Sequence, residues 1–184
     1  MTAATTFNLN ANKKTLFVFG GSQGSEALNQ CTAGMLQNIE DVQVLWQTGL
    51  GNIKKYENLE SDNVRVLPYV DDMQSAYALA DLSFSRAGAL TIAELTACGL
   101  PGVLVPLPSA AADHQTHNAR SIAAAGAAKM IPEKELDPVN TAGRIIALLH
   151  DEKKLFNMAH KSKNLGKPQS AKVIVDLILE KVSS

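Results

Sequence analysis

The sequence predicts an α/β fold, a Rossmann-like, doubly wound parallel sheet of about six strands in a single domain. Three observations lead to this prediction. Short apolar runs alternate with segments of helical spacing, the runs are continuous rather than alternating in polarity, and glycine-rich or polar turns follow several of them. Continuous apolar strands are typical of parallel sheets that helices cover on both faces. With 184 residues, 46% of them hydrophobic, the chain can bury one substantial core.

The overall composition excludes several classes of protein. A net charge of −1 provides no field that would recruit nucleic acid or an anionic membrane, so no nucleic-acid partner is expected. No apolar run of about 18 residues could span a bilayer, and residues 1–13 lack the apolar centre of a signal peptide. Cys31 and Cys98 are too few for a metal site or a disulfide framework, and both are expected to be buried in a reducing compartment. The cytoplasm is the default location.

The chain begins with residues 1–13, whose first twelve carry no clear periodicity. We interpret this segment as a tail or inter-domain linker before a domain at 14–184. The apolar run 14–19 predicts a buried strand, the glycine-rich turn 20–25 follows it, and helical spacing resumes at 27–36. The glycine spacing is neither that of a dinucleotide site nor that of a P-loop, so neither NAD nor FAD is inferred.

Five further strands are expected, at 42–47, 63–67, 82–85, 102–105 and 127–131. The spacing also predicts a short polar helix or turn at 54–59, a helix capped by Asp71 or Asp72, and helices at 90–98, 114–125, 137–149, 152–163 and 170–182. Asp113 is a candidate cap for the helix at 114–125. The last helix carries an apolar stripe of Val173, Ile174, Leu177 and Ile178. Packing in the core is the simplest explanation of this stripe, and packing on a second domain is the alternative.

Residues 85–101 combine a strand end, a glycine and a helix that ends at Gly99. Gly88 lies at the junction, where the missing Cβ lets the backbone approach a ligand closely. The first-turn N–H groups of the helix lack internal partners and lie at the positive end of its dipole, so they suit a phosphate. Glu94, about one turn later, could accept hydrogen bonds from two neighbouring ribose hydroxyls. The alternative is a turn glycine and a solvated helix acid, and spacing alone does not decide between the two.

Ligands of doubly wound sheets bind beyond the carboxyl ends of the strands. Four loops are expected at that edge: the glycine-rich turn 20–25, the turn at 71–72, the segment 86–91 and the loop around Gln115. We therefore expect these four loops to form one site.

Several motifs occur in order along residues 14–182: Gly20-Gly21-Ser22-Gln23-Gly24, Tyr69-Val70-Asp71-Asp72-Met73, Ser85-Arg86-Ala87-Gly88-Ala89-Leu90-Thr91 with Glu94, Gly99-Leu100-Pro101, His114-Gln115 with Asn118-Ala119, and Gly126-Ala127-Ala128-Lys129. Together they resemble the C-terminal, donor-binding half of the MurG family of bacterial UDP-N-acetylglucosamine transferases. The resemblance implies the C-terminal half of a GT-B glycosyltransferase, with residues 1–13 matching only the linker between its two domains.

The resemblance implies a role for each motif. Ser22 in the glycine-rich turn would meet the diphosphate region, its neighbour Gly21 is a further candidate binding residue, and backbone groups of Val70 would read the uracil edge. Glu94 would hold the ribose hydroxyls. The helix start Ala89, Leu90 and Thr91, which follows the candidate binding residue Gly88, would hold the diphosphate. The pair Gln115 and His114 would contact the N-acetylglucosamine hydroxyls.

Two positions leave alternatives open. Arg86 either neutralises phosphate charge or serves as a structural cation. His114 stands where some relatives have a second Gln, and the loop 109–112 is unusually bland, so sugar selectivity is less well specified than nucleotide selectivity. His114 and His117 are three residues apart, but no third ligand has a suggestive spacing, so no metal and no other cofactor is expected.

The family resemblance implies an inverting transfer of N-acetylglucosamine from UDP to a lipid-linked muramyl-pentapeptide, at the inner face of the cytoplasmic membrane. It places the acceptor site and the catalytic base in an N-terminal domain to which no part of this sequence corresponds. The alternative is an isolated UDP-N-acetylglucosamine-binding module, or a subunit that is inactive without an acceptor-binding partner. A UDP-sugar epimerase of the same architecture is a third possibility, and it would require catalytic acids from both halves.

Overall fold

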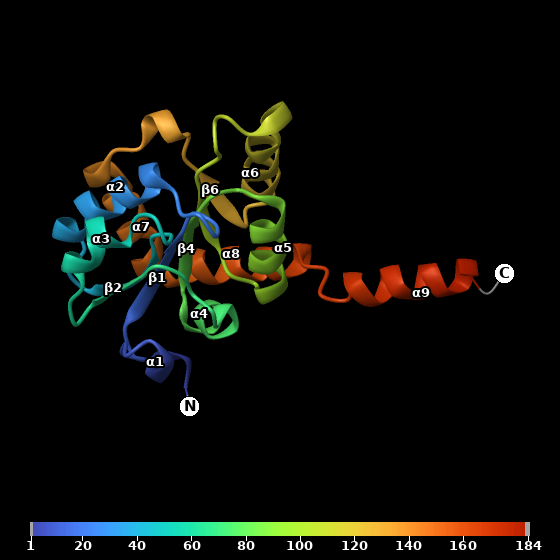
Figure 1. Ribbon diagram of the computed structural model, residues 1–184, viewed down its shortest axis with the longest axis horizontal. Helices are drawn as coiled ribbons and strands as arrows, with labels where there is room; N and C mark the ends of the chain where they lie inside the picture. The colour runs from blue at the N-terminus through green and yellow to red at the C-terminus, as the bar shows by residue number, and fades with distance from the viewer. Residues whose placement is uncertain (1, 183–184) are drawn as a thin grey trace.

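The computed structural model describes residues 2–182 and contains a six-stranded, fully parallel sheet with helices on both faces (Figure 1). The strand order is β3-β2-β1-β4-β5-β6. The strands are β1 Lys14–Phe19, β2 Val42–Gln47, β3 Val64–Leu67, β4 Leu82–Ser85, β5 Gly102–Leu104 and β6 Ala128–Met130. The predicted fold class is confirmed, and β1, β2 and β4 occupy the predicted ranges.

Nine α-helices and four short 3-10 helices are assigned in the described range. The α-helices are α1 Ala3–Thr6, α2 Glu26–Met35, α3 Ile53–Tyr56, α4 Met73–Leu79, α5 Ala89–Cys98, α6 His114–Ala124, α7 Pro138–His150, α8 Glu152–Leu165 and α9 Ser170–Val182. The 3-10 helices are η1 Leu36–Asn38, η2 Glu57–Leu59, η3 Ala111–Asp113 and η4 Glu133–Glu135. Asp72 caps α4, because its Oδ1 accepts a hydrogen bond from the Ser75 N–H at 2.9 Å.

The sheet separates two cores, because successive side chains of a strand point to opposite faces. On β1, Leu16 and Val18 pack with α2, α3, α7 and α8, whereas Phe17 and Phe19 pack with α4, α5 and α6. Both faces are therefore buried, which explains the continuous apolar strands. Figure 1 shows α2, α3 and α7 on one side of the sheet and α4, α5 and α6 on the other.

The strand order reverses between β1 and β4, which pair in the middle of the sheet with Phe19 opposite Ser85. At such a reversal the loops leaving the two strands diverge to opposite faces and leave a crevice between them. The glycine-rich turn follows β1 and the start of α5 follows β4, so the fold brings these two motifs to the same edge.

The N-terminal segment is packed against the domain, which differs from the predicted tail. Thr2 caps the short helix α1, and Ala4 and Phe7 are 4% and 7% exposed in the core beside α4. The Arg65 guanidinium donates to the Phe7 carbonyl at 2.9 Å. A single buried phenylalanine in a polar segment has no periodicity, so pattern reasoning missed this contact. Whether the segment also links two domains stays a prediction.

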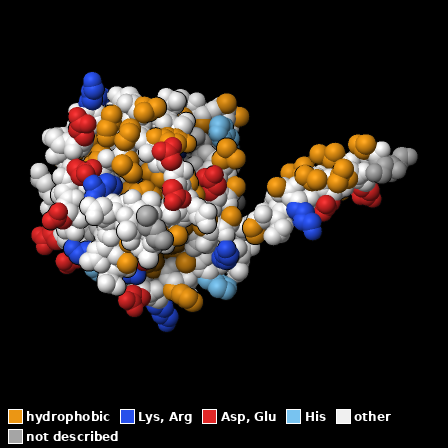
Figure 2. Space-filling model, turned by 60° about the horizontal axis from the view of Figure 1, so that its bottom comes forward, with side chains coloured by type: hydrophobic (Ala, Val, Ile, Leu, Met, Phe, Trp, Pro, Cys, Tyr) orange, Lys and Arg blue, Asp and Glu red, His pale blue; other side chains and the backbone are white. Residues whose placement is uncertain are grey.

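The prediction that the apolar stripe of α9 packs in the core of this domain is wrong. Figure 1 shows α9 extending away from the body, and Figure 2 shows apolar side chains along its surface. Val173, Ile174, Leu177 and Ile178 are each more than half exposed. Spacing predicts that a face is apolar but not what covers it. No helix within residues 2–182 is long and apolar enough to cross a membrane.

The two cysteines differ from each other. Cys31 is buried as expected, but Cys98 is exposed at the end of α5, so the prediction of two buried thiols is wrong at that position. Cys98 is the last residue of α5, directly before the C-cap Gly99, so being on a helix that packs in the core does not bury it.

Candidate functional site

The glycine-rich turn after β1 has a backbone that only glycine adopts readily. Gly21 and Gly24 have φ angles of +87° and +75°, in the left-handed region. A Cβ on Gly24 would lie 1.9 Å from the Thr48 carbonyl oxygen, so this turn packs tightly on the loop after β2. Ser25 then caps α2, and Ser22 stays exposed at the rim.

The start of α5 offers uncapped donors at the same edge. Gly88 is the N-cap, it makes no side-chain cap bond, and the first intrahelical bond runs from the Ile92 N–H to the Gly88 carbonyl at 3.0 Å. The N–H groups of Ala89, Leu90 and Thr91 therefore lack intrahelical partners and point out of the positive end of the helix dipole. These are the three residues that the sequence assigned to a phosphate.

The fold does not require glycine at position 88. Its φ is −64°, which any residue adopts, and an added Cβ would meet only the Thr91 Oγ1, at an ordinary 3.7 Å. A glycine that neither backbone strain nor crowding explains is consistent with a ligand that comes close to the backbone.

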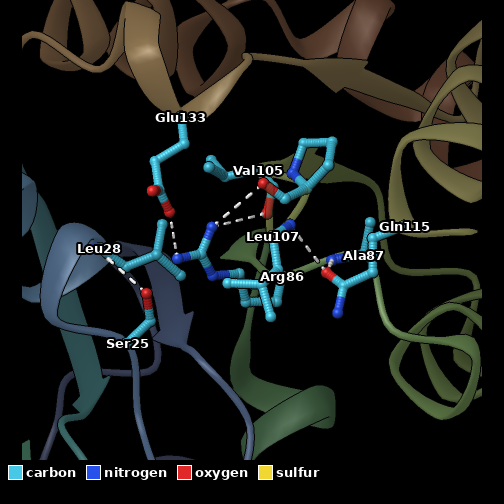
Figure 3. A network of polar contacts seen from close by, with 9 residues as sticks. Ser25, Leu28, Arg86, Ala87, Val105, Leu107, Gln115 and Glu133 are labelled. Carbon is cyan, nitrogen blue, oxygen red and sulfur yellow. Dashed lines mark hydrogen bonds and ion pairs between the residues drawn. The ribbon is translucent and has the colours of Figure 1, made fainter. Parts of the chain in front are cut away.

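Helix α6 fixes the peptide that precedes Gly88 (Figure 3). The Gln115 Oε1 accepts from the N–H groups of Ala87 and Leu107, at 3.2 and 3.1 Å, and the Asn118 Nδ2 donates to the Ala87 carbonyl at 3.1 Å. Gln115 therefore ties the loops after β4 and β5 together. With its oxygen engaged, only its Nε2 lacks a hydrogen-bond partner in the described part of the chain, so toward a ligand this side chain is a donor.

Arg86 has its charge paired inside the protein, which supports the structural alternative. The residue is 8% exposed, and its guanidinium donates to the carbonyls of Val105 and Pro106 at 3.3 and 3.2 Å. It also forms an ion pair with Glu133 of η4 (Figure 3). These contacts join the loops after β4, β5 and β6, so Arg86 holds the edge of the sheet together and has little charge left for a phosphate.

Sequence reasoning missed Gln47, which ends β2 and is 3% exposed. Its Nε2 donates to the Gly21 carbonyl at 3.0 Å, and its Oε1 accepts from the Val70 N–H at 2.8 Å. The Val70 N–H is therefore occupied, and only its carbonyl is without a partner among residues 2–182. The available signal was an amide at the carboxyl end of a mostly apolar strand.

Glu94 lies exposed on α5 and meets α4 through Tyr77. The Tyr77 hydroxyl donates to the Glu94 Oε2 at 2.7 Å. Burial, with the hydrogen bond and the negative charge of Glu94, raises the pKa of Tyr77 well above its usual range, so the phenol stays protonated at neutral pH. The Glu94 Oε1 has no hydrogen-bond partner within the described range.

The loop before α6 is irregular. Ala112 and Asp113 have φ angles of +49° and +53°, which non-glycine residues seldom adopt, and Asp113 makes no side-chain cap bond to α6. The prediction of a capping aspartate is therefore wrong. His114 is exposed, and its Nδ1 lies 2.7 Å from the Ala111 carbonyl. Over residues 2–182, no group of three or more His, Cys, Asp and Glu side chains could hold a metal ion.

A separate cleft of about 700 Å³ lies at the opposite edge, where Lys14 begins β1 and where Asp81 and Pro101 precede β4 and β5. We place the candidate site at the carboxyl edge instead, because the helix start, the glycine-rich turn and the switch between β1 and β4 meet only there.

Comparison with known proteins gives a consistent picture. A family model described as the glycosyltransferase family 28 C-terminal domain matches residues 15–174. The chain is 42% identical over 170 residues to the UDP-N-acetylglucosamine--N-acetylmuramyl-(pentapeptide) pyrophosphoryl-undecaprenol N-acetylglucosamine transferase of Chlorobium luteolum. It is 40% identical over 185 residues to the transferase of the same name from Salinibacter ruber. These alignments cover 90% and 96% of this chain but 46% and 49% of the relatives.

Solved structures agree with this. A crystal structure of Acinetobacter baumannii MurG is 34% identical with a TM-score of 0.82, over 92% of this chain and 52% of that chain. Spinosyn forosaminyltransferase SpnP, 17% identical with a TM-score of 0.72 over 94% of this chain and 44% of that one, shares the fold alone. The chain thus spans about half the length of the relatives it matches.

Proposed function

This chain belongs to the glycosyltransferase family 28 C-terminal domains, and we propose that it binds the UDP-N-acetylglucosamine donor of a peptidoglycan-synthesising transferase. The complete enzyme would move N-acetylglucosamine to a lipid-linked muramyl-pentapeptide at the inner face of the cytoplasmic membrane. The names of the relatives support the substrate pair. Because the chain spans about half their length, we place the acceptor site and the catalytic base in the half that it does not match.

The observation that carries the proposal is the uncapped start of α5. Three backbone N–H groups without intrahelical partners face the loop edge, and Gly88 leaves room for a ligand against the backbone. An anion at a helix start is favoured by both the free donors and the dipole. Ser85, just before this loop, has a buried hydroxyl without a hydrogen-bond partner in the described structure, which is a further unused polar group near this edge. We assign the diphosphate to this position.

We assign the rest of the donor to polar groups around the proposed diphosphate position. The Glu94 Oε1 has no partner in the described structure and its Oε2 accepts only from Tyr77, so both can serve the ribose hydroxyls, and Gln115 has an amide donor left for a sugar oxygen. Because the Val70 N–H is bonded to Gln47, we assign its carbonyl to the uracil N3–H. We assign exposed Ser22 of the glycine-rich turn to the diphosphate as well.

The proposed chemistry is a direct displacement at the anomeric carbon, with inversion. The acceptor hydroxyl attacks, its proton goes to a base outside this chain, and UDP leaves with the electron pair of the broken bond. The N–H groups at the start of α5 would then stabilise the charge that grows on the diphosphate, because donors fixed in advance need no reorganisation during the reaction. In this scheme no metal is needed.

Calorimetry and thermal unfolding test the donor assignment. Ligand at 100 times its dissociation constant should stabilise the chain by about 2.7 kcal/mol, as mass action requires. Glu94→Gln should weaken UDP-N-acetylglucosamine binding by about tenfold or more, because a charged acceptor is lost. If Glu94→Gln binds as tightly as the parent chain, the ribose assignment is wrong.

The second candidate is a binding module that needs a separate acceptor-binding partner. The coverage of about half of each relative favours it. The purified chain would then bind the donor but transfer no sugar until the partner is added. Transfer to a lipid-linked muramyl acceptor by the chain alone would contradict both this candidate and our placement of the base.

A further inference from the structure

Tyr77 links two helices at the ribose end of the proposed site. It lies on α4, is 8% exposed, and donates through its hydroxyl to the Glu94 Oε2 on α5 at 2.7 Å. We infer that Tyr77 is a positioning residue of the donor site, which holds the Glu94 carboxylate in place for the two ribose hydroxyls. This inference rests on the proposed function, because it takes Glu94 as the ribose ligand.

The position of the Tyr77 hydroxyl is set by the sheet rather than by the loops. Its ring packs edge-on against Phe17 and Phe19 of β1, with centroid distances of 5.9 and 6.1 Å. These two rings are almost fully buried and stack on each other with a centroid distance of 4.5 Å. The phenol is therefore a rigid donor on the core side of an exposed carboxylate.

A rigid donor matters because a free glutamate samples many rotamers. Binding a diol would have to select one of them, and the lost freedom would weaken the affinity. With Oε2 held by Tyr77, the carboxylate plane is set before the ligand arrives, and Oε1 has no competing partner in the described chain. The Tyr77 phenol keeps its proton at neutral pH and so remains a hydrogen-bond donor, because burial raises its pKa. Each carboxylate oxygen can accept more than one hydrogen bond, so Oε2 remains available to the second ribose hydroxyl.

A merely structural hydrogen bond between α4 and α5 is the competing explanation. If the bond were only structural, its loss in Tyr77→Phe would lower the stability of the chain but would not change how binding depends on the ribose hydroxyls. Comparing UDP with 2′-deoxy-UDP separates the two explanations. The two ligands differ only in one hydroxyl, from which Glu94 would accept a hydrogen bond.

Calorimetry on the 184-residue chain should show UDP binding about tenfold or more tightly than 2′-deoxy-UDP, as expected for a hydrogen bond to a charged group. In Tyr77→Phe, the affinity for UDP should fall by about fivefold while that for 2′-deoxy-UDP falls less than about twofold, because only the diol needs the oriented carboxylate. In the Glu94→Gln background, Tyr77→Phe should have no further effect on the ratio.

Tyr56→Phe is the matched control, since Tyr56 is buried on the other face of the sheet and donates in the same way to Glu26 at 3.3 Å. It should leave the ratio of the two affinities unchanged. If Glu94→Gln removes the discrimination but Tyr77→Phe keeps it, the inference about Tyr77 is wrong and the proposed function stands. If the parent chain does not discriminate between the ligands, the ribose assignment itself fails and the inference fails with it.

Discussion

Replacing Gly88 should separate binding from stability, because the fold does not need a glycine at that position. An alanine Cβ would meet only the Thr91 Oγ1 at 3.7 Å, and the φ of −64° suits any residue. Alanine is a poorer N-cap than glycine by roughly 0.5–1 kcal/mol, and the stiffer unfolded chain returns roughly 0.4–1 kcal/mol. The two effects offset each other, so Gly88→Ala should change the free energy of unfolding by less than about 0.5 kcal/mol.

The same methyl group should damage the ligand site. It would stand where the diphosphate is proposed to approach the backbone, so UDP-N-acetylglucosamine affinity should fall by at least about tenfold, or about 1.4 kcal/mol. Gly88→Ser should weaken binding too, while its hydroxyl caps α5 and raises stability by a few tenths of a kcal/mol or more. Calorimetry gives the affinities, and urea unfolding gives the stabilities.

Gly143→Ala is the control, because that glycine lies in α7 and an added Cβ would meet nothing within 4 Å. It should stabilise the chain by about 0.5–1 kcal/mol and leave binding unchanged. If Gly88→Ala folds normally and binds the donor within twofold of the parent, the assignment of the diphosphate to the start of α5 is refuted.

Three further predictions concern stability. Glu133→Gln should destabilise the chain by about 3 kcal/mol in urea unfolding, because it leaves the buried charge of Arg86 without its partner. A cost below about 1 kcal/mol would show that this ion pair contributes little to stability. Phe7→Ala should cost about 3 kcal/mol if the N-terminal segment belongs to the core, and almost nothing if it is a tail. Leu177→Ser on α9 should change stability by less than about 0.5 kcal/mol, since the side chain is 56% exposed; a large loss of stability would place it in a core.

The fold class and the position of most helices and strands could be predicted from the amino-acid sequence. Continuous apolar runs and glycine-ended helices carry local signals, and local signals are enough when each strand is buried on both faces. The order of strand, Gly88 and helix also predicted where backbone N–H groups would be free to bind a phosphate, because the unpaired N–H groups of a helix start follow from helix geometry alone. Family resemblance then added the roles of Glu94 and Gln115, which stay predictions.

Which polar groups already have hydrogen-bond partners depends on how distant segments pack together. Arg86 is neutralised by a residue 47 positions later, Gln47 occupies the Val70 N–H, and Tyr77 reaches Glu94 from a neighbouring helix. The burial of Phe7 and the exposure of α9 were decided in the same way. A side chain's hydrogen-bond partners depend on which segments the sheet brings together, and spacing along the chain carries no record of that. Spacing predicts what a residue could bind; packing determines which of its atoms remain available to bind it.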